Sequence, residues 1–239
     1  MSIAEKLQTI AENEQKVFDA GTEAGKQAQE KAFWDRFLMY SALKSANYLF
    51  AGGGWHKDNF KPNKNLKPVS AAYMFCSFMG IYGYSSAFDL VEHLEGLGIT
   101  LDLSRATTLS QCFNWACFTR IGVIDCSSAT SIPSMFANAQ IGIIDKLIVH
   151  ENLTYSNAFQ NLSRTTHMTV EGVIGKNGFN IQWMVNLDHE SLMSIINALK
   201  DYSTDTSGTV WKVTIGATNR AKLTTDELLI ASNKGWMVE

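Results

Sequence analysis

IDCSSATSIPSMF occupies residues 124–136, and two further segments of the chain resemble it. LDLSRATTLSQCF (101–113) lies 23 residues upstream, and LIVHENLTYSNAF (147–159) lies 23 residues downstream. In this register the three copies share apolar residues at four places, the first (Leu101, Ile124, Leu147), third (Leu103, Cys126, Val149), ninth (Leu109, Ile132, Tyr155) and last (Phe113, Phe136, Phe159). A constant period of this length indicates a structural repeat rather than a catalytic motif.

Each copy is expected to form one strand, a turn and a short helical piece that ends in Phe. The first and third positions face one side of the strand, and the second position faces the other. One such unit cannot bury its own apolar side, so neighbouring units are expected to stack about 4.8 Å apart, with the Phe rings in a column. A period of 23 falls within the range of about 20–29 residues of leucine-rich repeats. The predicted fold class is therefore α/β, a leucine-rich-repeat solenoid with a parallel sheet.

Three regions are expected along the chain. Residues 1–32 are predicted to form an N-terminal helix with a narrow apolar seam, which packs on the rest of the chain or on copies of itself. Residues 33–89 are rich in aromatic side chains and are expected to cap the array. Residues 90–239 are predicted to form the repeat array and its C-terminal cap.

The C-terminal repeats are expected to contain longer helices. IQWMV (181–185) and VWKVTI (210–215) are predicted strands. Asp188 is the expected N-cap of a helix with an apolar stripe, and Thr224 or Thr225 is the expected cap of a second helix that stops at Gly235. The stripe consists of Leu192, Ile195, Ile196 and Leu199.

The composition excludes several classes of protein. The chain has 239 residues, 46% of them hydrophobic, and a formal net charge of −3, which argues against a dedicated nucleic-acid binder. Four lysines in residues 57–67 are expected on a solvated loop, with a polyanion contact as the alternative. No apolar run reaches the roughly 18–20 residues of a membrane helix, and the polar N-terminus does not resemble a signal peptide. A cytoplasmic or virion location is expected, with the extracellular surface as the alternative.

No catalytic residue, metal or cofactor is predicted. The run Asp188-His189-Glu190-Ser191 is the densest polar cluster, but consecutive helical residues point in different directions, so helix capping explains it. Asp102 and Asp125 are expected one above the other, on a solvated face rather than as a calcium site. The four cysteines form no CxxC pair, so buried free thiols are expected.

The outward strand positions form the predicted partner surface. These positions are Asp102, Ser104, Asp125, Ser127, Ile148 and His150. Because stacked repeats expose an extended curved face, we expect this surface to bind a protein or a cell-surface glycan.

The third copy, KLIVHENLTYSNAFQNL (146–162), resembles the BspA-like type of leucine-rich repeat, most closely at Ala158 and Phe159. His150 stands where that family often has Pro, and Cys112 and Met135 replace the Ala before Phe in the first two copies. Four further segments are similar to a group of Firmicutes prophage and gut-phage proteins that pair an N-terminal helix with a BspA-like array. They are MSIAEKLQTIAENEQKVFDAG (1–21), YLFAGGGW (48–55), LDHESLMSIINALKDYS (187–203) and TIGATNRAKLTTDELLIASNKGW (214–236).

The resemblance implies a leucine-rich-repeat fold and a place among phage tail-associated proteins, and it transfers no catalytic residue. The sequence thus predicts a non-enzymatic interaction module. A secreted adhesin of the BspA-like type is the alternative. A phage glycan hydrolase would need two carboxylates about 5–9.5 Å apart in a cleft, and no such pair is evident in the sequence.

Overall fold

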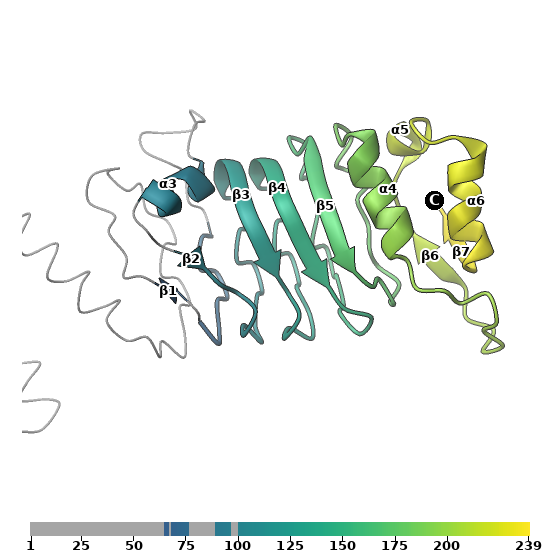
Figure 1. Cartoon of the computed structure of the whole chain (residues 1–239), viewed down its shortest axis with the longest axis horizontal. Helices are drawn as coiled ribbons and strands as arrows, with labels where there is room; N and C mark the ends of the chain where they lie inside the picture. Colours follow the sequence, from purple (N-terminus) through teal and green to yellow (C-terminus); the bar gives the residue numbers. More distant parts are fainter. Residues whose placement is uncertain (1–64, 67, 77–88, 97–99) are drawn as a thin grey trace, which may run out of the picture.

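The computed structural model describes residues 65–66, 68–76, 89–96 and 100–239 (Figure 1). The helix predicted for residues 1–32, the lysines of the 57–67 loop and most of the 33–89 region lie outside the described residues. Within the described ranges, every helix is too short or too polar to cross a membrane.

A parallel three-stranded sheet forms the centre of the described part of the chain. Its strands are β3 (Cys117–Asp125), β4 (Gln140–Val149) and β5 (His167–Gly172), paired in that order (Figure 1). Paired residues in β3 and β4 are 23 residues apart, as in Ile124 with Leu147. The α/β class and the parallel sheet are therefore confirmed. Between β4 and β5 one extra residue enters the period, and an irregularity between Ile144 and Lys146 absorbs it.

The strands are longer than predicted and begin earlier. The prediction assigned the first positions of the second copy, from Ile124, to its strand, whereas β3 starts at Cys117 and ends at Asp125. The buried side chains of β3 include Phe118, Ile121 and Ile124, and such β-branched and aromatic residues favour an extended, half-buried backbone. The aligned segments thus begin where each strand ends.

The helical piece predicted before each Phe is wrong, because the chain forms turns there. In the turn around Phe136, Ser134 has φ 52° and Asn138 has φ 59°. A left-handed residue cannot continue a right-handed helix. The same two positions are left-handed one period away on either side, at Gln111, Trp115, Asn157 and Asn161.

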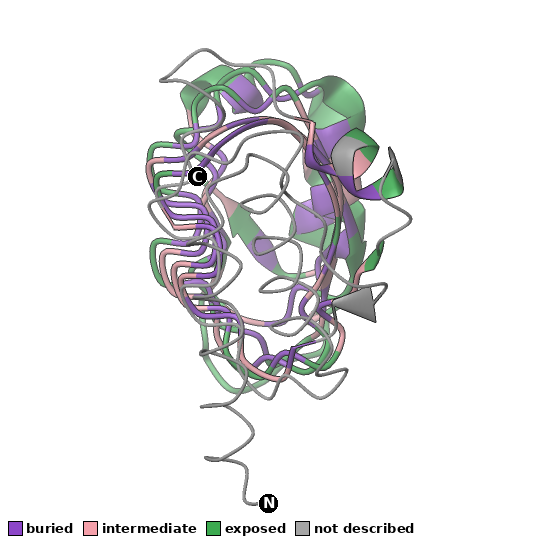
Figure 2. Ribbon diagram, turned by 90° about the vertical axis from the view of Figure 1, so that its left-hand side faces the viewer, coloured by how far each residue is buried: buried purple, intermediate pink, exposed green. Residues whose placement is uncertain are grey.

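The core lies between the sheet and these turns, with buried residues on the inner side of each layer (Figure 2). The predicted Phe column is confirmed, since Phe136 stacks on Phe113 at 5.6 Å and on Phe159 at 5.9 Å between ring centroids. Phe75 lies outside the three aligned copies and extends the column, because its ring stacks on that of Phe113 with centroids 5.0 Å apart. Phe113, Phe136 and Phe159 are almost fully buried, so each contributes roughly 1.5–3 kcal/mol to folding.

Helix α4 (His189–Ala198) lies beside β5 and closes the edge of the sheet (Figure 1). The Ser191 hydroxyl accepts the backbone N–H of Met168 at 2.9 Å, and the Ser194 hydroxyl accepts that of Val170 at 3.0 Å. The free backbone groups of an exposed strand edge can pair with another chain, and here the two serine hydroxyls bind the N–H groups of that edge. The N-cap at Asp188 and the buried apolar stripe are as predicted.

The C-terminal unit contains β6 (Trp211–Val213), α5 (Ala217–Arg220), α6 (Thr225–Asn233) and β7 (Trp236–Val238). β6 pairs with β7 in parallel, which confirms the predicted strand in 210–215. Thr224 caps α6 in a capping box with Glu227, as expected for one of the two candidates. The strand predicted at 181–185 is wrong, because the Asn180 side chain accepts the N–H of Gln182 and starts a turn.

At the other end, β1 (Asn65–Leu66) pairs in parallel with β2 (Thr100–Leu101). Helix α3 (Leu90–Gly96) packs on β3. There Val91 lies so close to Gly122 that an added Cβ would come within 3.1 Å of Val91 Cγ2. The described residues at this end thus continue the row of layers on the N-terminal side of β3 (Figure 1).

Candidate functional site

The first two layers of the predicted partner surface place Asp and Ser at the strand ends. The Asp102 carboxylate accepts the backbone N–H of Ser104 at 2.9 Å, and the Asp125 carboxylate accepts that of Ser127 at 2.8 Å. A side chain that bonds the backbone two residues later forms an Asx turn. Both aspartates therefore shape the turn that leaves the strand, and Ser127 remains exposed.

Ile148 and His150 lie on the third layer, next to the other four. Ile148 pairs with Asp125 in the β3–β4 register. His150 Nε2 donates to the carbonyl of Ala129 at 2.7 Å, and its Nδ1 accepts the N–H of Asn152 at 3.4 Å. The structure thus brings the six predicted residues together on three adjoining layers. Their contacts there join one layer to the next, as when the Ser127 hydroxyl lies 3.5 Å from the Ser104 carbonyl.

Charged side chains on the three central strands pair across the strands next to this surface. Arg120 of β3 makes a bidentate ion pair with Asp145 of β4, at 2.7 and 2.8 Å. The Asp145 carboxylate raises the pKa of Arg120 further above its ordinary value. Lys146 of β4 pairs with Glu171 of β5. The result is a polar sheet surface on which cations and anions of neighbouring strands are paired.

The Asp188-His189-Glu190-Ser191 run has the capping role that its spacing indicated. Asp188 Oδ1 accepts the N–H of Ser191 at 2.8 Å and its hydroxyl at 2.6 Å, while Oδ2 lies 2.7 Å from His167 Nδ1. Burial tends to raise the pKa of Asp188, but the hydrogen bonds from Ser191 and His167 outweigh it and lower the pKa. The Ser191 proton points at a carboxylate rather than a His ring, which is not the arrangement of an activated serine nucleophile.

The four cysteines are free thiols; Cys112, Cys117 and Cys126 are buried and Cys76 is half-buried. Burial strongly raises the pKa of the Cys112 and Cys126 thiols. A thiol held neutral is a poor nucleophile and a poor metal ligand. Across the described ranges, no three His, Cys, Asp or Glu side chains converge in a way that fits a metal ion.

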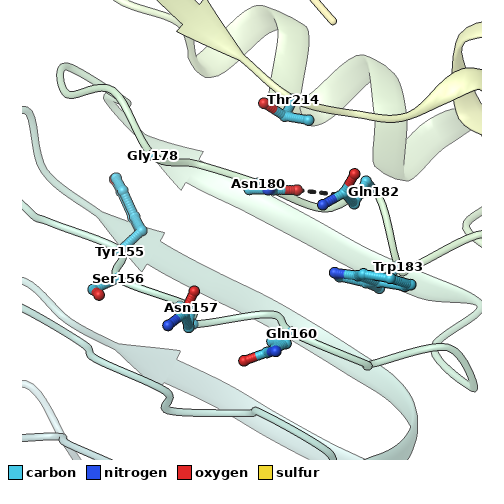
Figure 3. A pocket seen from close by; sticks show the side chains of 10 residues that line it. Tyr155, Ser156, Asn157, Gln160, Gly178, Asn180, Gln182, Trp183 and Thr214 are labelled. Carbon is cyan, nitrogen blue, oxygen red and sulfur yellow. Dashed lines mark hydrogen bonds between the residues drawn. The ribbon is translucent and has the colours of Figure 1, made fainter.

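Sequence reasoning missed a polar pocket on the turns. Its volume is about 460 Å³, and it lies between the turn at 155–160, the turn at 178–183 and Thr214 (Figure 3). The side chains around it include Asn157, Gln160, Gln182 and Trp183. The strand predicted at 181–185 hid this site, because it assigned Gln182 and Trp183 to opposite sides of a strand instead of to one turn. A surplus of amide side chains at these turns was the available signal in the sequence.

Comparisons of the chain with models of protein families, with curated proteins and with solved structures find no match.

Proposed function

We propose that the chain is a leucine-rich-repeat solenoid that acts as a non-enzymatic interaction module of a phage or prophage tail. The observation that supports this proposal best is the 23-residue register between β3 and β4, with the stack from Phe113 through Phe136 to Phe159. An array of equivalent layers presents an extended surface for a partner, and its stability comes from contacts between neighbours.

The proposed partner surface comprises the strand ends and the adjoining sheet. It contains Asp102, Ser104, Asp125, Ser127, Ile148 and His150, and next to them the pairs Arg120–Asp145 and Lys146–Glu171. Side chains held in ion pairs and turns lose little conformational freedom on binding, which favours association. A surface on which cations and anions are balanced suits a folded protein or a cell-surface glycan better than a polyanion, which would require an excess of cations.

The location of the protein in the native system tests the tail assignment. Virions are purified from an induced culture of the strain that carries the gene, and an antibody against the chain is used on virions and on uninduced cells. Label on the virion supports the tail protein. Label on the wall of uninduced cells, with none on virions, supports the BspA-like adhesin instead.

The partner surface is tested with a bulky charge at an exposed position. Ser127→Arg places this charge at the strand ends, and Leu229→Arg places the same charge on the exposed face of α6 as the matched control. We expect Ser127→Arg to reduce the amount of chain retained on the labelled particle or cell, while Leu229→Arg leaves it unchanged. Equal retention of both variants would contradict the proposed surface.

Self-association through the N-terminal helix is a separate part of the proposal. The full chain and a variant that lacks residues 1–32 are compared by sedimentation equilibrium. We expect the full chain to have a multiple of its 26.5 kDa mass and the shortened chain to be a monomer. A monomer in both cases removes self-association from the proposal.

A further inference from the structure

The polar pocket spans three successive layers of the chain. Asn157 and Gln160 come from the turn at 155–160, Gln182 and Trp183 come from the turn at 178–183, and Thr214 follows β6 (Figure 3). A volume of about 460 Å³ lies within the range of about 300–1,000 Å³ that small-molecule sites occupy.

The residues that line the pocket are uncharged. None of the ten is Asp, Glu, Lys, Arg or His. An ionic ligand would enter without a counter-charge among these residues, which is unfavourable away from bulk water. The lining therefore favours a neutral ligand.

The amide side chains of the pocket are available to a ligand. Among the described residues, no hydrogen bond engages the side chains of Asn157, Gln160 or Gln182, and the Asn180 carbonyl oxygen is used while its NH₂ group has no partner. Each amide offers two donors and a carbonyl acceptor. Groups that both donate and accept at several points around a ligand match a molecule covered in hydroxyls.

Trp183 adds an apolar surface to this polar site. Trp183 is 47% exposed although indole is strongly apolar, and its side chain lies between the amides of Gln160 and Gln182 in the view of Figure 3. The face of an aromatic ring carries a partial negative charge and attracts C–H groups that carry a partial positive charge. A pyranose has such a C–H face and, around its rim, the hydroxyls that amides bind.

We propose that this pocket binds a neutral saccharide, with Trp183 stacking on the sugar ring and Gln160 and Gln182 bonding its hydroxyls. The site is separate from the strand-end partner surface, so the inference stands whether or not that surface binds a protein. The turns that carry it are already fixed by bonds to adjoining layers, as from Ser134 N–H to the Ser156 carbonyl at 2.8 Å. Little ordering is therefore required on binding.

A peptide is the other ligand class that amide groups attract, and the backbone around the pocket disfavours it. A peptide that adds as a strand needs free N–H and C=O groups along an edge. Here the N–H of Ile181 donates to the Thr214 carbonyl at 2.8 Å, and the N–H of Thr214 donates to the Phe179 carbonyl at 3.1 Å. These backbone groups are already used between the layers.

The test is calorimetric titration of the full chain with defined probes. Four neutral trisaccharides (chitotriose, cellotriose, maltotriose and mannotriose) are used up to about 10 mM, a range that detects weak binding. Trigalacturonic acid and tetra-alanine serve as acidic and peptide probes. We expect at least one neutral trisaccharide to bind and the acidic and peptide probes not to bind.

Variants locate the binding. Trp183→Ala is expected to reduce the affinity for the saccharide by about tenfold or more. Gln160→Ala is expected to reduce it by about two- to tenfold, the effect of one lost hydrogen bond. Trp115→Ala is the matched control, because Trp115 is 56% exposed and lies outside the pocket. Circular dichroism verifies that each variant is folded. Failure of all four neutral probes to bind, binding of only the acidic or peptide probe, or equal loss in Trp183→Ala and Trp115→Ala would overturn the proposal.

Discussion

The rings of Phe113 and Phe136 stack with centroids 5.6 Å apart and planes 13° from parallel, although 23 residues separate them in the chain. Backbone bonds accompany this contact, since the N–H of Phe113 donates to the Met135 carbonyl at 2.8 Å. The same relation recurs between Phe136 and Phe159. Each Phe thus buries its ring against the ring of the next layer, and no layer completes its core alone.

Phe136→Ala should be among the most destabilising single substitutions in the described chain. The ring is fully buried between two others, so its removal leaves a cavity that rigid neighbours cannot fill. We expect a loss of about 3–5 kcal/mol in the free energy of unfolding. Urea denaturation measures it, with Phe136→Leu as a milder variant. A Phe136→Ala protein as stable as the parent would contradict the stacked register.

Tyr155→Phe should leave the protein as stable as the parent or more stable. The Tyr155 hydroxyl is buried and has no hydrogen-bond partner among the described residues, and burial raises the pKa of the phenol. An unsatisfied buried polar group costs about 1–3 kcal/mol, and Phe removes it. Tyr202→Phe is the matched control, because the Tyr202 hydroxyl donates to the Gly175 carbonyl at 2.8 Å. Thermal unfolding should rank Tyr155→Phe above Tyr202→Phe, and the reverse order would refute this account.

Ser191→Ala should lower the free energy of unfolding, because it leaves a backbone N–H at the sheet edge without a partner. The Ser191 hydroxyl is fully buried and accepts the N–H of Met168, so alanine leaves that donor without a partner. We expect a loss of about 1–3 kcal/mol in urea denaturation, together with faster hydrogen exchange at Met168. Ser207→Ala, on an exposed loop, is the control and should change little. Unaltered exchange at Met168 would mean that α4 does not protect β5 in this way.

The sequence predicted those features that depend on apolar spacing. Four apolar positions at a fixed period yielded the layer register and the Phe column, and apolar residues at helical spacing yielded the buried stripe of α4. The caps at Asp188 and Thr224 were predictable because a capping side chain acts on the backbone within three residues. Local chemistry and periodicity were sufficient for these elements.

The features that failed depend on the backbone between those positions. A short helical piece was predicted to end at Phe136, yet Ser134 and Asn138 have left-handed φ values. A turn that is stabilised by the next layer can impose such values. IQWMV has strand propensity, but the Asn180 side chain bonds the backbone and turns the chain. The pocket was missed for the same reason, since its lining meets only when two turns and the residue after β6 stack on one another.

The loss of stability at acidic pH should depend in part on Asp188. Its pKa is below the ordinary value of 3.8, so the folded state favours the carboxylate. The stabilisation is therefore complete above about pH 4 and is lost as the pH falls through the lower folded pKa. Asp188→Asn keeps a capping oxygen but removes the charge. Because the side chain is 46% exposed, we expect less than about 1 kcal/mol of difference at pH 7.

Urea denaturation of the parent and Asp188→Asn between pH 2 and 7 measures this difference, and the two curves should converge at the acidic end. Asp226→Asn, on the exposed first turn of α6, is the control for a general loss of negative charge. A constant gap at every pH would show that the carboxylate contributes only through its shape.

The fixed register also constrains how this chain can change in length during evolution. Paired residues of β3 and β4 are 23 residues apart, and the one extra residue before β5 requires an irregularity between Ile144 and Lys146. Because neighbouring side chains of a strand face opposite sides, a one-residue insertion within a strand moves apolar groups outward unless a bulge absorbs it. Gain or loss of a whole layer leaves the register within the remaining layers intact. Descendants of this gene should therefore differ in length mostly by multiples of one repeat.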